Sequence, residues 1–146
     1  MDPRNVLKNI YLFREATPED LAAVAAIAEP KAYMIQEYLY HSGDMADAIF
    51  IIESGTIDIT LKDKDVPLGS IGAGQALGEM AFFERQERLA SALTREPTHL
   101  LRLPFTKLDD VFAKRPTLAA SFCRQACVFL ARQLRMLAPD LNRRYL

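Results

Sequence analysis

Short alternating apolar segments run through the middle of the chain, between residues 32 and 104. In each of them an apolar residue recurs at every second position, which is the period of a β-strand with one buried face. Clusters of glycine, serine and aspartate separate the segments, as turns between strands require. The clearest alternations are Ile49/Ile51, Ile57/Ile59/Leu61 and Leu101/Leu103. Many short strands at such spacing predict a β-barrel or jelly roll.

The two ends of the chain have the period of helices instead. Residues 1–31 contain Thr17 followed by a proline and two acidic residues, a typical helix start, and Pro30 is expected to end this helical region. Residues 105–146 predict two further helices that Pro116 separates, the last one long. The expected fold is mainly β with flanking helices in a single domain, 1–146: N-terminal helices over 1–31, a β-barrel over 32–104 and C-terminal helices over 105–146.

The charge balance argues against a broad electrostatic attraction to polyanions. The 146 residues carry 18 basic and 19 acidic side chains, for a formal net charge of −1. Direct binding to nucleic acid or to a membrane is therefore not expected, and any anion site must be local. No apolar run reaches the length of a membrane span and the N-terminus lacks the order of a secretory signal, so a cytoplasmic protein is predicted.

Residues that carry catalytic or metal chemistry are sparse. Cys123 and Cys127 lie four residues apart in a predicted helix, where we expect two small core residues. His41 and His99 stand alone, so no metal site is predicted. No nucleophile has an adjacent base and no acids are paired at working distance. The sequence therefore predicts no catalytic residues and no enzyme.

One segment, residues 77–91, combines the parts of an anion site. Gly78 lets the backbone approach a ligand closely, and a turn of helix that begins there offers unpaired N–H groups. Arg88 follows ten residues later and can donate two hydrogen bonds to a pair of anionic oxygens. Glu79 can accept hydrogen bonds from ribose hydroxyls. Together these residues predict a pocket for a sugar phosphate.

This segment resembles the phosphate-binding cassette of the cyclic nucleotide-binding domain family, and the resemblance continues along the chain. The matching stretches are Leu12-Phe13 and Thr17–Leu21 (entry helices), His41–Asp44 and Ala48–Gly55 (first barrel hairpins) and Ile71–Glu79 (the run into the cassette). They cover roughly residues 10 to 135 in one unbroken order. The resemblance implies a barrel that binds a cyclic nucleotide and needs no cofactor.

The resemblance also implies which residues form the site. The cassette residues that would hold the phosphate and ribose are Gly78, Glu79, Met80, Ala81, Arg88, Leu89 and Ala90. The residues that would lie against the base are Ile59, Leu68 and Ile71. The last helix would cover the base, with Phe129, Arg132, Gln133 and Arg135 as candidate lid residues.

Two departures from the family pattern flank the arginine. Leu89 stands where the family has a small or hydroxyl residue, so its bulk is expected to narrow the pocket, and the missing hydroxyl favours cyclic AMP over cyclic GMP. Glu87 brings negative charge near the phosphate unless it points to solvent. Arg88 could also lie in a solvated turn beside Glu84, and Glu79 could simply stabilise a helix start.

The last helix carries an apolar stripe wider than one contact face needs. The resemblance implies that part of this stripe pairs two copies of the chain in a homodimer, with Phe122 and Phe129 as candidate contacts. The predicted function is a non-catalytic sensor in which cyclic nucleotide moves this helix about a hinge near Arg115-Pro116. The alternative is a family member that has lost nucleotide binding and serves as a dimerisation module.

Overall fold

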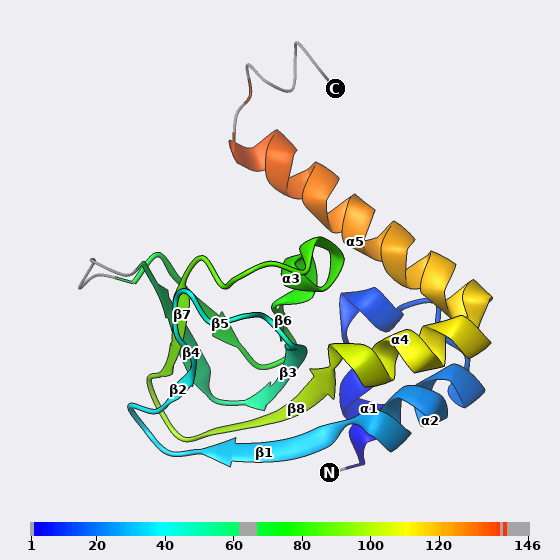
Figure 1. Cartoon of the computed structure of the whole chain (residues 1–146), viewed down its shortest axis with the longest axis horizontal. Coiled ribbons are helices and arrows are strands. Elements are labelled where there is room, and N and C mark those ends of the chain that lie inside the picture. The colour runs from blue at the N-terminus through cyan, green and yellow to red at the C-terminus, as the bar shows by residue number, and fades with distance from the viewer. Residues whose placement is uncertain (1, 62–66, 138, 140–146) are drawn as a thin grey trace.

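The structure is a computed structural model that describes residues 2–61, 67–137 and 139. Helices lie at both ends of the chain with the strands between them, as predicted (Figure 1). The helical elements are α1 (Pro3–Leu7), the 3-10 turn η1 (Tyr11–Phe13), α2 (Pro18–Ile27), α3 (Glu79–Glu84), α4 (Phe105–Lys114) and α5 (Pro116–Leu137). The strands are β1 (Glu29–Tyr33), β2 (Tyr38–Tyr40), β3 (Ala48–Ser54), β4 (Thr56–Thr60), β5 (Gly69–Gly72), β6 (Ala76–Leu77), β7 (Ser91–Thr94) and β8 (Thr98–Pro104). The end of the predicted C-terminal region, residues 138 and 140–146, lies outside this description.

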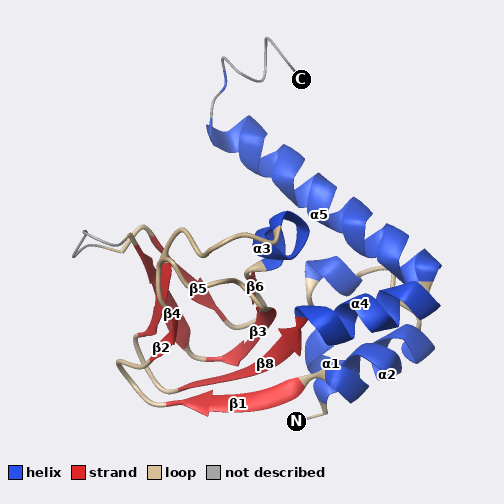
Figure 2. Ribbon diagram, in the orientation of Figure 1, coloured by secondary structure: helices blue, strands red, loops and turns tan. Residues whose placement is uncertain are grey.

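The strands form two four-stranded antiparallel sheets, with the orders β1-β8-β3-β6 and β2-β7-β4-β5. Successive strands switch repeatedly between the two sheets, which Figure 2 shows as a rolled arrangement of strands beside a separate group of helices. Both sheets contribute to one apolar cluster between them, made of Ala48, Phe50, Ile52, Ile57, Ala92 and Leu100. The prediction of a mainly β jelly roll with flanking helices is confirmed.

Strand β3 is buried on both faces, which simple alternation did not indicate. Phe50 and Ile52 point into the cluster between the sheets, whereas Ile49 and Ile51 belong to a second cluster shared with the helices. The helices thus cover the outer face of the sheet that contains β3. A strand enclosed in this way reads as a continuous apolar run.

The N-terminal region is broken into shorter elements than predicted. The Thr17 side chain accepts a hydrogen bond from Asp20 N at 3.1 Å, and the Asp20 side chain accepts one from Thr17 N, so the expected helix start is a complete capping box. However, α2 ends at Ile27, and Pro30 lies inside β1, paired with Leu101. Because β1 is an edge strand, half of its N–H groups point away from the sheet, and a proline is tolerated there.

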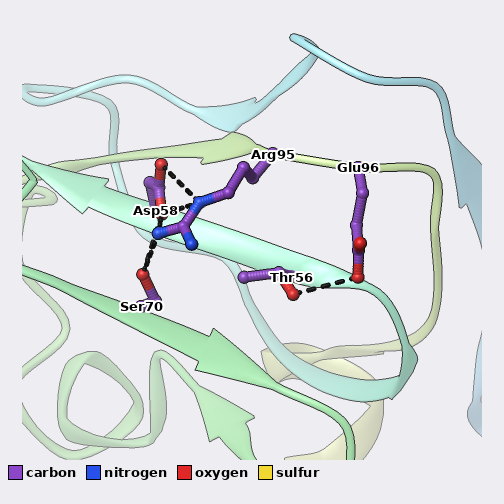
Figure 3. A network of polar contacts seen from close by, with 5 residues as sticks. All are labelled: Thr56, Asp58, Ser70, Arg95 and Glu96. Atoms are coloured by element: carbon purple, nitrogen blue, oxygen red, sulfur yellow. Dashed lines mark hydrogen bonds and ion pairs between the residues drawn. The ribbon is translucent and has the colours of Figure 1, made fainter.

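A polar network crosses one exposed face of the β4–β5 pair (Figure 3). Arg95, which follows β7, donates to Asp58 on β4 and lies beside Ser70 on β5, whose hydroxyl donates to Asp58 at 2.8 Å. Nearby, the Thr56 hydroxyl donates to Glu96 at 3.0 Å. The Arg95 contact lowers the pKa of Asp58. These bonds fix the register of three neighbouring segments on the side of the sheet that faces away from the core.

Helix α5 has two different halves. Its first half packs on the body of the protein, where Phe122 is fully buried against the rings of Phe13, Phe82 and Phe112. Its last residues, 131–137, are all exposed, and Figure 1 shows this end of α5 leaving the body. Phe122 is therefore a core residue and is excluded as a dimer contact.

Cys123 and Cys127 are both exposed free thiols, so the expectation of two small core residues is wrong. The helix turns its buried face, which contains Leu118, Phe122 and Ala126, toward the body. Residues 123 and 127 lie on a different side of the helix, because they fall one position after 122 and 126 in a 100° repeat.

Candidate functional site

Near its start the cassette contains a glycine, Gly78, that no other residue could replace without strain. Gly78 precedes α3 and has a φ of +93°, in the left-handed region that favours glycine. A β-carbon at this position would lie 2.6 Å from Arg88 Nη1 and 3.2 Å from the Ala48 carbonyl oxygen. The arginine side chain therefore occupies the space that the glycine leaves open.

Arg88 is held from both its backbone and its side chain. Its N–H donates to Asp44 O at 2.7 Å and its carbonyl accepts from Gly43 N at 2.8 Å, which ties the cassette to the turn after β2. Its Nη2 donates to Ala48 O at 2.8 Å. The residue is only 6% exposed. The alternative of a solvated turn beside Glu84 is therefore wrong.

The charge of Arg88 has no carboxylate partner in the part of the chain that the structure describes. Its guanidinium instead lies over the ring of Tyr40, with 4.1 Å between Cζ and the ring centre. Burial lowers the pKa of Arg88. A buried guanidinium with N–H groups to spare is a strong donor for an incoming anion.

A cavity of about 200 Å³ lies against this guanidinium. Six of the predicted cassette residues border it, namely Gly78, Met80, Ala81, Arg88, Leu89 and Ala90. The remaining lining residues are Tyr40, Glu84, Gln86 and Glu87. The structure therefore brings the predicted phosphate residues together around one small cavity.

The two residues beside Arg88 do not obstruct this cavity. Leu89 borders it, yet 85% of the residue is exposed, so its bulk lies mostly in solvent. Glu87 is exposed as well, and its backbone is bridged to Met45. The expectation that Leu89 narrows the pocket is therefore not supported by its position, and the charge of Glu87 is screened by water.

Glu79 faces away from this cavity. It borders a second one, of about 350 Å³, together with Tyr11 and Phe129, and Gly78 borders both. Glu79 is 8% exposed, and its Oε2 and the Tyr11 hydroxyl have no hydrogen-bond partner within residues 2–61, 67–137 and 139. Burial raises the pKa of Glu79, and burial together with the charge of Glu79 raises the pKa of Tyr11.

Two of the three residues predicted to contact the base lie together: Ile59 on β4 and Ile71 on the paired strand β5 both pack against the cluster between the sheets. Ile71 also borders the 350 Å³ cavity, whereas Leu68 is 61% exposed. The residues of α5 predicted to cover the base do not border the 200 Å³ cavity. Phe129 stacks on Tyr11 with ring centres 4.9 Å apart, and the other three lid residues, Arg132, Gln133 and Arg135, are exposed.

Tyr40 is the one cavity residue with a specific contact to Arg88 that the sequence reasoning missed. It ends β2, and the segment His41–Asp44 that follows it carries part of the family resemblance. An aromatic residue at the end of a strand is usually part of a core, and nothing in its spacing indicates an arginine partner. Only the packing of β2 beside the cassette reveals the pair.

Neither a metal-binding cluster nor a membrane-spanning helix occurs among the residues that the structure describes. No group of three or more histidine, cysteine, aspartate or glutamate side chains there could hold a metal ion. None of the helices described has both the length and the apolar character needed to cross a membrane.

The fold and the cassette agree with the matches to known proteins. The family model of the cyclic nucleotide-binding domain matches residues 30–115. The chain therefore belongs to the cyclic nucleotide-binding domain family, which confirms the resemblance seen in its sequence. The cavity beside Arg88, which six residues of the predicted cassette border, is therefore the candidate site.

Individual relatives cover most of this chain but little of their own length. The chain is 31% identical over 116 residues to the cAMP-dependent protein kinase regulatory subunit of Candida albicans, a match that covers 76% of this chain and 25% of that protein. It is 29% identical over 123 residues to Glutaminase 2 of Bradyrhizobium diazoefficiens, which covers 84% of this chain and 19% of that protein. The chain thus spans about a quarter or less of these curated relatives.

Solved structures agree on the fold. The N-terminal domain of a transcriptional regulator from Streptomyces coelicolor A3(2) matches with a TM-score of 0.79 over 94% of this chain and 96% of that chain. The two sequences are 23% identical, so this likeness concerns the fold alone.

Proposed function

We propose that this domain is a non-catalytic sensor of a cyclic nucleotide, and that the ligand is cyclic AMP rather than cyclic GMP. The observation that carries the proposal is Arg88, a buried guanidinium without a carboxylate partner in the described structure, against a cavity bordered by six cassette residues. The family assignment and the relative named as a cAMP-dependent protein kinase regulatory subunit support the choice of ligand. Two exposed free thiols fit a reducing compartment, so we place the domain in the cytoplasm.

In this proposal the cyclic phosphate accepts hydrogen bonds from Arg88 and from backbone N–H groups of the cassette. The ribose hydroxyls donate to Glu79, whose Oε2 lacks a partner in the described part of the chain. The side chain of Glu79 must turn from the 350 Å³ cavity toward the 200 Å³ cavity, and the neighbouring Gly78 borders both. Ile59, Leu68 and Ile71 then close around the base.

We further propose that α5 is the output of the sensor. Tyr11 lies between the cassette and this helix, since Glu79 influences the pKa of its hydroxyl and its ring stacks on Phe129. If the Glu79 side chain rotates toward the ribose, the surroundings of Tyr11 change, and with them the packing of Phe129 on the Tyr11 ring. The hinge is assigned to Arg115-Pro116, where α4 and α5 meet.

A homodimer through α5 completes the proposal. Five exposed residues, Cys123, Cys127, Leu130, Leu134 and Leu137, follow one another at intervals of four, three, four and three. This spacing is the a/d repeat of a two-stranded coiled coil. Two copies of α5 side by side would cover the stripe.

The same stripe favours a second candidate function, a dimerisation module without a ligand, because it does not depend on the cassette. Titration calorimetry with cyclic AMP, cyclic GMP and adenosine separates the two. The sensor proposal expects binding of cyclic AMP, weaker binding of cyclic GMP and none of adenosine, which lacks the phosphate. Absence of binding by all three at millimolar ligand would favour the module.

A further inference from the structure

Tyr40 and Arg88 form a contact that the family motif does not describe. The Arg88 Cζ atom lies 4.1 Å from the centre of the Tyr40 ring and 5.8 Å from that of Phe50. The two rings are themselves 5.9 Å apart, so they form one aromatic wall behind the guanidinium. Tyr40 comes from β2 and Phe50 from β3, which belong to different sheets.

The two rings can stabilise the Arg88 guanidinium without competing with a phosphate. A buried guanidinium needs a partner when no ligand is present, yet a carboxylate partner would compete with the incoming phosphate. The face of an aromatic ring attracts a cation without accepting its in-plane N–H groups. Among the protein atoms described, only the Ala48 carbonyl, 2.8 Å from Nη2, takes a hydrogen bond from the Arg88 side chain.

Tyr40 also separates two cavities. It borders the cassette cavity of about 200 Å³ and also a third cavity, of about 410 Å³, which Asp44 and Asp47 line. Of these two carboxylates, that of Asp47 already pairs with Arg102 at 2.9 Å. Arg88 borders both cavities, so a smaller residue at position 40 would let the Arg88 side chain swing toward Asp44. The Tyr40 ring keeps the guanidinium on the cassette side.

We propose that Tyr40 is a positioning residue of the phosphate site: its ring holds Arg88 in the orientation in which the spare N–H groups meet the phosphate. The inference rests on the proposed function, because it concerns the same cavity. It assigns the effect to the aromatic face, so the Tyr40 hydroxyl is not required.

Calorimetry with cyclic AMP on Tyr40→Leu and Tyr40→Phe tests this assignment. Loss of the ring should weaken binding about 5- to 30-fold, the range of a partly desolvated cation–π contact. Tyr40→Phe keeps the ring and should stay within about twofold of the wild type. Tyr38→Leu is the matched control, because Tyr38 lies in the same strand, is exposed and stacks on His41, and this variant should bind as the wild type does.

A double-mutant cycle separates positioning from packing. If the ring acts through the guanidinium, Tyr40→Leu should weaken binding no further in an Arg88→Gln background. If the fold-losses of cyclic AMP affinity in the two single variants multiply in the double variant instead, the ring only supports the barrel and the inference is wrong. Equal affinity of Tyr40→Leu and wild type would also overturn it while leaving the proposed function intact. A wild-type protein that binds no cyclic nucleotide would overturn both.

Discussion

Arg88 and Glu79 are buried ionisable side chains without an oppositely charged partner in the structure described. Such groups are costly to bury, because the contacts that remain, a carbonyl oxygen and an aromatic ring in the case of Arg88, do not replace all of the lost hydration. Proteins keep them where a ligand supplies the missing partner. We therefore expect both residues to destabilise the ligand-free protein and to favour the bound one.

Glu79→Gln should stabilise the ligand-free protein near pH 7.5 and weaken cyclic AMP binding. Burial raises the pKa of Glu79, so the folded state holds its proton more tightly than the unfolded state does. The resulting stabilisation is present at pH values below the ordinary glutamate pKa of about 4.3 and is lost as the pH rises through the raised value. At neutral pH the variant avoids an ionised buried carboxylate.

Thermal melting and calorimetry measure the two effects of Glu79→Gln. We expect a melting temperature about 2–4 °C higher than wild type at pH 7.5, for roughly 1 kcal/mol of relief, and no gain near pH 4. Affinity for cyclic AMP should fall about tenfold with the lost ribose contact. Glu84→Gln is the control for the melting experiment, since Glu84 is exposed on the same helix. A gain in stability that is the same at both pH values would contradict the account.

At the residue scale, the sequence predicts a role through chemical type and spacing, and the orientation of a side chain depends on packing. That Gly78 and Arg88 lie together was predictable, because the segment that contains them resembles the phosphate-binding cassette of the family. The direction of Glu79 was not, since it depends on Tyr11 and α5. The exposure of Cys123 was missed because small residues fit either face of a helix.

At the scale of elements, the strands and the last two helices follow from periodicity and turn residues. α4 and α5 lie where predicted on either side of the Arg115-Pro116 junction, and α3 begins directly after Gly78. The exception is Pro30, which lies in β1 because an edge strand tolerates a missing N–H. Edge position is a property of the assembled sheet and cannot be read from a single segment.

Hydrogen exchange tests the role of α5 as the output element. Residues 131–137 are exposed and their helix has little packing to protect it. If cyclic AMP moves α5, amides from Phe129 to Leu137 should exchange more slowly with ligand, together with the cassette amides from Gly78 to Phe83. Amides of the doubly buried strand β3 should change little.

Arg88→Ala provides the control for this experiment, because cyclic AMP at the same concentration should leave its exchange unchanged. Unaltered exchange of α5 in a wild-type sample with demonstrated ligand binding would show that the helix is not the output. The dimerisation module would then be the better description of α5.

At the scale of the whole molecule, the exposed stripe on α5 predicts a dimer. Leu134→Glu should give a folded monomer by sedimentation, because it places a charge in the seam of the proposed pair. Met136→Glu is the matched control, since Met136 is exposed on the opposite side of the helix and should leave the dimer intact. Phe122→Glu is unsuitable for this test, because Phe122 is fully buried and its replacement would unfold the protein.

The thiols give a second readout of the same dimer. In a parallel pair each Cys123 faces its own copy across the two-fold axis, so oxidised glutathione should yield a disulfide-linked dimer and reduced glutathione. Cys123→Ser together with Cys127→Ser should abolish the product. A wild-type protein that sediments as a monomer at high concentration would contradict the dimer, whatever the result for the ligand.

The central claim is that Arg88 binds the phosphate of a cyclic nucleotide, and calorimetry of Arg88→Ala with cyclic AMP tests it most directly. Loss of a charge-assisted, two-pronged contact should cost about 2–3 kcal/mol, or roughly 30- to 150-fold in affinity. Arg85→Ala is the matched control, because Arg85 lies in the same segment but pairs with Asp109 at 2.7 Å and should bind like wild type. Equal affinities of Arg88→Ala and wild type for cyclic AMP would contradict the claim.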